Sequence, residues 1–156
     1  MGEIKLSKKP KILYLLVVLW ITLAVILLIL GYLSLELSIY IIQHTSEILA
    51  WDSMLFFGMV FLTTALLIFG AIFILFAYET FRGKAWVWNA GVIISTIFIV
   101  IFGFMLASIM FTALQFRDDF TITTLEAAVV SFLTDLGIIF LITRPNIKEY
   151  MLKKEI

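Results

Sequence analysis

The sequence contains no cysteine, one histidine and two prolines, and only 14% of its 156 residues are charged. The absence of cysteine excludes disulfides, thiolate catalysis and cysteine-ligated metal or iron–sulfur sites. A single histidine excludes a haem held by two histidines of this chain. Pro10 and Pro145 flank long apolar runs and do not interrupt them. Each run can therefore form a continuous helix.

Apolar sequence is what the chain has in excess. Hydrophobic residues make up 63% of it, against about 45–50% in soluble domains. A membrane-spanning helix needs about 20 apolar residues, and four runs reach that length, at residues 12–35, 54–78, 86–114 and 124–143. The sequence therefore predicts an all-α membrane protein, in which residues 1–156 form a single polytopic domain folded as a four-transmembrane-helix antiparallel bundle.

Basic and acidic segments alternate along the chain, although its formal net charge is zero. Ten of the eleven Lys and Arg residues lie before the first run, between the second and third, or after the fourth. Arg117 is the exception, and it adjoins Asp118 and Asp119. Because cytoplasmic loops retain Lys and Arg, the pattern predicts a multi-pass protein of the cell membrane with cytoplasmic N- and C-termini. The predicted outer loops are residues 43–53 and 115–123.

The connections between the runs carry three further predictions. The first helix is expected to continue past residue 35 to about residue 42, because the sequence there stays largely apolar. Asp52 or Ser53 is the expected N-cap of the second helix. The short connection at residues 79–85 predicts that the second and third helices are antiparallel neighbours.

Asp135 is the sharpest functional lead, because it lies about midway along the fourth apolar run. An Asp at the bilayer centre costs about 2.5–3.5 kcal/mol, so such residues usually face protein or a water-filled cavity. At the same depth the first helix offers Trp20 and Thr22, and the third offers Ser95 and Thr96. The indole N–H and the hydroxyls of these side chains are the expected donors to the Asp135 carboxyl.

Three roles are open for Asp135. A protonated carboxyl can join helices through hydrogen bonds to neighbouring hydroxyls. Alternatively, the group can relay protons or cations in a transporter or channel. In the third alternative its partner is a basic residue of another subunit. The sequence does not choose among these roles.

Other polar residues receive structural assignments. Thr123 and Glu126 fit a capping box at the start of the fourth helix, with Thr123 as N-cap and Glu126 at the third helical position. His44 and Glu47 would share one face of a helix and could bind a divalent ion. A solvated acidic loop is the favoured interpretation of that pair, and the metal site is the alternative.

No nucleophile–base pair, glycine-rich phosphate loop or metal-ligand cluster occurs in the sequence. We therefore assign no catalytic residue and no cofactor, and the basic segments give no support for nucleic-acid binding. The sequence favours a non-catalytic accessory or scaffold subunit of a larger membrane complex, which contacts the lipid bilayer and other membrane subunits or further copies of itself. The alternative is an oligomeric proton-linked transporter or channel that uses Asp135.

Overall fold

The computed structural model describes residues 10–44, 50–115 and 119–152, and all the regular structure within them is helical. In chain order these residues form α1 (Lys11–His44), α2 (Ala50–Arg82), α3 (Ala85–Gln115), α4 (Asp119–Ile142) and α5 (Pro145–Leu152). Four of these helices, α1 to α4, are long and apolar enough to cross a membrane. The predictions of an all-α chain and of four apolar helices are therefore confirmed.

Proline and glycine determine where several helices begin and end. Pro10 directly precedes α1. Gly83 separates α2 from α3 and has a φ of 70°, a left-handed conformation that glycine adopts without steric cost. Pro145 begins α5, at a position where the N–H that proline lacks would have no intrahelical partner. A corner therefore joins α4 to α5.

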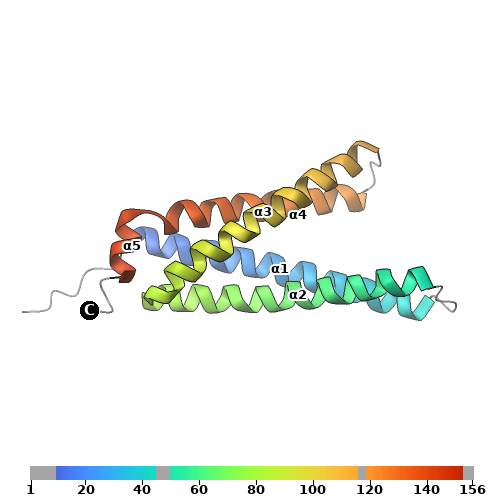
Figure 1. Ribbon diagram of the computed structural model, residues 1–156, viewed down its shortest axis with the longest axis horizontal. Coiled ribbons are helices and arrows are strands. Elements are labelled where there is room, and N and C mark those ends of the chain that lie inside the picture. Colours follow the sequence, from blue (N-terminus) through green and yellow to red (C-terminus); the bar gives the residue numbers. More distant parts are fainter. Residues whose placement is uncertain (1–9, 45–49, 116–118, 153–156) are drawn as a thin grey trace, which may run out of the picture.

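The first hairpin consists of α1 and α2, which pack against each other along much of their length (Figure 1). A Cβ atom placed on Gly70 would lie 2.7 Å from the Leu28 side chain and 3.3 Å from the Ala24 carbonyl oxygen. Farther from the α2–α3 turn, the Ser34 and Thr63 hydroxyls form a hydrogen bond of 2.6 Å. Small and hydroxyl-bearing residues allow apolar helices to approach closely, which explains this extended contact.

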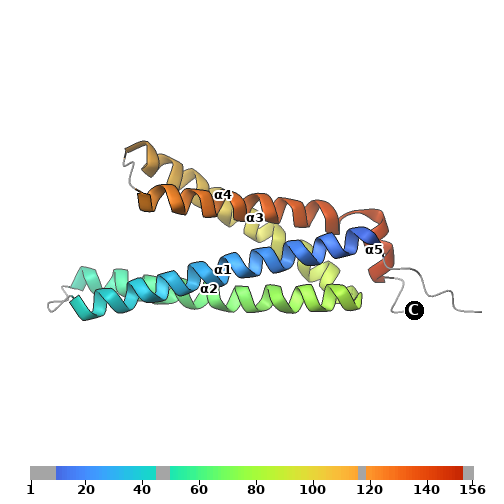
Figure 2. The same cartoon turned by 180° about the vertical axis from the view of Figure 1, so that it is seen from behind.

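The second hairpin consists of α3 and α4, and Figures 1 and 2 show that the two hairpins meet at one end of the molecule and diverge toward the other. The meeting end contains the start of α1, the α2–α3 turn and the α4–α5 corner. We call it the basic end, because it carries the exposed cations Lys11, Arg82, Lys84, Arg144 and Lys148. The opposite end, where α1 connects to α2 and α3 to α4, is the hairpin end.

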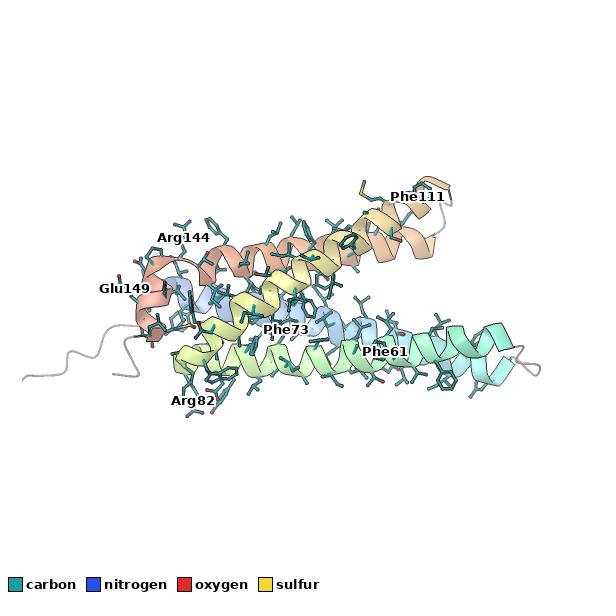
Figure 3. All side chains as sticks on the ribbon, viewed as in Figure 1. Phe61, Phe73, Arg82, Phe111, Arg144 and Glu149 are labelled. Carbon is teal, nitrogen blue, oxygen red and sulfur yellow. The ribbon has the colours of Figure 1, made fainter. Side chains whose placement is uncertain are left out.

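Aromatic side chains fill the core where the hairpins meet. Trp20 of α1 is fully buried and stacks on Phe73 of α2, with ring centroids 5.2 Å apart. Phe73 also meets Phe98 of α3 at 5.1 Å. Figure 3 shows Phe73 in this region and Phe61 nearer the hairpin end, where the side chain of Phe61 is 78% exposed. The core therefore lies in the basic half of the molecule.

Some predicted boundaries were wrong. The connections at the hairpin end are shorter than residues 43–53 and 115–123, because α1 continues to His44, α2 begins at Ala50 and α4 begins at Asp119. Asp52 and Ser53 therefore lie within the first turn of α2 and not at its N-cap.

The predicted pairing of the second and third helices holds only in part. Near their turn, α2 and α3 contact each other through aromatic rings, including Phe76 and Trp86 at 5.6 Å. However, α2 packs mainly on α1, and α3 packs mainly on α4. The short turn makes α2 and α3 neighbours at the basic end, and packing within each hairpin then separates them.

Candidate functional site

Asp135 lies on the buried face of α4. Its side chain is 0% exposed, and Ser131, Ile138 and Ile142, which lie one or two turns away, are equally buried. These positions recur every three to four residues and so share one face of the helix. With this face α4 packs against α1 and α3. Asp135 therefore points into the protein and not toward the surface that lipid would cover.

Ser95 of α3 lies opposite Asp135. The register between α3 and α4 is set at Gly91, where an added Cβ would be 2.7 Å from the Ile142 side chain. Ser95 follows Gly91 by one turn, and Asp135 precedes Ile142 by about two turns, so antiparallel packing brings the two polar side chains to a similar depth. Among the described residues, neither the Ser95 hydroxyl nor the Asp135 carboxyl has a hydrogen-bond partner.

Trp20 of α1 adds a third polar group near this level. Its indole ring lies against Gly91, 3.2 Å from the position that a Cβ would take there. The indole N–H is buried and has no hydrogen-bond partner within residues 10–44, 50–115 and 119–152. We call Trp20, Ser95 and Asp135 the polar layer. Each unpaired buried donor or acceptor costs about 1–3 kcal/mol, so this layer is the least satisfied part of an otherwise well-packed core.

Thr22 and Thr96, which were predicted to join this layer, do not. The Thr22 hydroxyl donates to the Val18 carbonyl oxygen at 3.0 Å, and the Thr96 hydroxyl donates to the Val92 carbonyl oxygen at 2.7 Å. A threonine in a helix commonly forms such a bond to the carbonyl one turn earlier. In addition, a residue adjacent to Ser95 in a helix points about 100° away from it. Depth along the span was therefore not sufficient to identify the hydrogen-bond donors near Asp135, and it included two threonines that bond to their own helices.

Thr80 is a buried polar residue that the sequence argument missed. Its side chain is 0% exposed, and its hydroxyl has no hydrogen-bond partner. The sequence does indicate that Thr80 is buried, because Thr80 follows Phe73 and Phe76 at the spacing of residues on one helix face. It lies close to the end of α2, on the buried side that faces the basic end of the core.

The capping-box prediction for Thr123 and Glu126 is corrected by the start of α4. Because α4 begins at Asp119, Thr123 lies inside the helix and is not its N-cap. Glu126 lies about two turns from the helix start and is exposed, too far for a strong interaction with the helix dipole. Of the suggested metal pair, Glu47 lies outside the described residues, as does the side chain of His44.

The polar layer combines a carboxyl, a hydroxyl and an indole N–H from three helices. These groups can exchange hydrogen bonds with one another or hold a proton on the carboxyl. Toward the hairpin end, the Ser131 and Thr134 hydroxyls donate to carbonyl oxygens of their own helix, at 2.8 Å and 2.7 Å. In the described part of the chain, these hydroxyls are thus engaged within α4 and do not extend the layer.

Comparisons with known protein families, with curated proteins and with solved structures give no match to this chain.

Proposed function

We propose that this chain is a multi-pass protein of the cell membrane that acts as a non-catalytic accessory or scaffold subunit, with its basic end in the cytoplasm. Exposed Lys and Arg residues at the basic end support this orientation, because cytoplasmic segments retain such charges. Figure 3 labels two of them, Arg82 and Arg144, at the same end of the molecule. The orientation leaves the hairpin end on the outer side of the membrane.

The length of the helices carries the scaffold proposal. With 34 residues, α1 is about 51 Å long at about 1.5 Å per residue, whereas the hydrocarbon core is about 30 Å thick. To stay inside that core, α1 would have to tilt by more than about 50°, beyond the usual range of about 0–40°. α2 has 33 residues and α3 has 31, so each of them would also need a tilt of about 50° to stay inside the core, beyond the usual range. Their ends therefore project past the core.

Apolar side chains cover these projecting ends. Ile39 of α1 is 45% exposed and Phe111 of α3 is 66% exposed. Both lie about 40 Å along their helices from the basic end, by the rise per residue. Large apolar side chains exposed outside the lipid core would mark a site of protein interaction. Another membrane subunit, or a second copy of this chain, would bury that surface.

Site-specific photocrosslinking in native membranes tests this proposal. A photoreactive amino acid at Ile39 or Phe111 is expected to yield a crosslinked protein of defined mass, which mass spectrometry identifies. Leu133 is the matched control, because it is 60% exposed but lies near the middle of its span. It should yield only lipid adducts. Lipid adducts from all three positions would contradict the proposed scaffold.

A proton-linked transporter or channel is the second candidate, and the unpaired carboxyl of Asp135 favours it. The substitutions Asp135→Asn and Asp135→Leu separate the two functions. If Asp135 is a proton relay, Asn should preserve folding and abolish proton-linked flux in liposomes. If Asp135 joins helices, Asn should be silent, and Leu should weaken the fold by about 0.6–1.7 kcal/mol, the usual contribution of an interhelical hydrogen bond.

A further inference from the structure

The α4–α5 corner is held rigidly against the bundle. The indole N–H of Trp88 in α3 donates to the Ile142 carbonyl oxygen at 2.8 Å, and this carbonyl belongs to the last residue of α4. On the other side of the corner, Ile147 and Met151 of α5 are fully buried. Side chains that project from this corner therefore keep a fixed position relative to α3 and α4.

Two cations project from the corner, and each is supported by an aromatic ring. The Arg144 guanidinium lies 4.3 Å from the centroid of the Phe140 ring, and the Lys148 ammonium lies 5.0 Å from the centroid of the Trp88 ring. Arg144 directly precedes α5, and its carbonyl oxygen accepts a hydrogen bond from the Lys148 backbone N–H at 3.0 Å, so the two residues lie one turn apart. Among the described residues, neither cation forms an ion pair, whereas Arg82 at the same end is bonded to Glu79 at 3.2 Å.

The position of this pair corresponds to the level of the lipid headgroups. The apolar span of α4 ends at Ile142. Arg144 follows two residues later, so it lies about 3 Å beyond the end of that span. Phe140 and Leu136, 57% and 37% exposed, continue from the corner along the surface of the span. A guanidinium binds a phosphate group through two parallel hydrogen bonds, and an ammonium binds it as a point charge.

We propose that Arg144 and Lys148 together bind the phosphate headgroup of an anionic phospholipid, whose acyl chains lie along the exposed apolar face of α4. The rings of Phe140 and Trp88 hold the two cations in place before the lipid arrives, which reduces the ordering that binding requires. Because neither cation has a carboxylate partner among the described residues, both charges can bind the headgroup. This inference depends on membrane insertion of α4 and does not depend on the proposed scaffold function.

Lipid titration of the purified full-length protein in detergent tests the proposal, with bound phosphatidylglycerol and phosphatidylcholine counted by native mass spectrometry. Replacement of both cations, Arg144→Gln with Lys148→Gln, should weaken phosphatidylglycerol binding about 30-fold, because each cation contributes about five- to sixfold. The control Arg82→Gln with Lys84→Gln removes the same charge from the same end and should change binding much less, because neither of these residues belongs to the proposed headgroup site.

Three outcomes would overturn the proposal: equal losses in the two double variants, equal binding of both lipids by the unmodified protein, or displacement of phosphatidylglycerol by inorganic phosphate at equal concentration. The last outcome would identify free phosphate as the ligand. The exchange Arg144→Lys with Lys148→Arg should retain phosphatidylglycerol binding. If the double variant does not fold, phosphatidylglycerol binding is measured with Lys148→Gln alone. An unchanged affinity of that single variant would also overturn the proposed site.

Discussion

The basic end and the hairpin end of this molecule consist of the same four long helices but are held together differently. At the basic end, Trp20, Phe73 and Phe98 join three helices through ring contacts of about 5 Å. Toward the hairpin end the two hairpins separate (Figure 1), and polar contacts such as that between Ser34 and Thr63 lie within one hairpin. Stability is therefore expected to be concentrated in the basic half.

This difference also separates the two kinds of surface that the molecule offers. In the basic half, Trp20, Phe73 and Phe98 are buried where the hairpins meet, and exposed Lys and Arg residues lie at the end of the molecule. The hairpin half keeps large apolar side chains exposed, among them Phe61 and Phe104 at 78% and 75%. The hairpin half thus combines exposed apolar side chains with separated hairpins, and both features suit the proposed binding of partner subunits at that end.

The largest expected effect comes from the aromatic core. Trp20→Ala should lower the free energy of unfolding by about 3–5 kcal/mol, because it removes a fully buried large side chain and leaves a cavity. Phe61→Ala is the matched control in the hairpin half, where 78% exposure implies little change. Unfolding by sodium dodecyl sulfate in mixed micelles, followed by circular dichroism, measures both. Equal losses would show that stability is not concentrated in the basic half.

A glycine pair tests the same contrast by adding volume. At Gly91 a new Cβ would lie 2.7 Å from Ile142 and 3.2 Å from Trp20, whereas Gly58 near the hairpin end has no such neighbour within 4 Å. Overpacking should make Gly91→Leu less stable by about 1–3 kcal/mol. Gly58→Leu should be neutral or slightly stabilising, because leucine favours a helix over glycine by up to about 1 kcal/mol. The same unfolding titration measures the stability of both variants. A destabilised Gly58→Leu would contradict the free space that surrounds Gly58 near the hairpin end.

Much of the fold could be predicted from the sequence, because long apolar runs without internal proline can form helices throughout. The ends were less predictable. Thr123 and Thr124 have low helix propensity, yet they lie inside α4, because propensity is a weak preference that the rest of a long helix can override. The divergence of the hairpins was not predictable either, since uniformly apolar helices do not indicate which face meets which neighbour.

The candidate site shows the same limit. Depth along the span predicts Ser95 at the level of Asp135, because the rise per residue is constant in a helix, and both side chains are buried. Depth says nothing about rotation around the helix axis, so Thr22 and Thr96 were included although their hydroxyls bond to their own backbones. Thr80 was missed because it lies at another depth. Its spacing from the buried phenylalanines of α2 is the signal that would have found it.

The smallest expected effect concerns the polar contact that joins α1 and α2 toward the hairpin end. In a double-mutant cycle, Ser34→Ala and Thr63→Ala should show a coupling energy of about 0.6 kcal/mol, and at most about 1.7 kcal/mol, as for other interhelical hydrogen bonds in membranes. Thr64 provides the control, because its hydroxyl donates to the Val60 carbonyl oxygen of its own helix at 2.8 Å. The cycle of Ser34→Ala with Thr64→Ala should therefore show no coupling.

These two cycles decide how the hairpin half is held. A coupling near the expected value means that the Ser34–Thr63 bond adds a modest contribution to close packing within the first hairpin. A coupling well above about 1.7 kcal/mol would mean that this single polar contact, and not close packing alone, holds α1 against α2 toward the hairpin end.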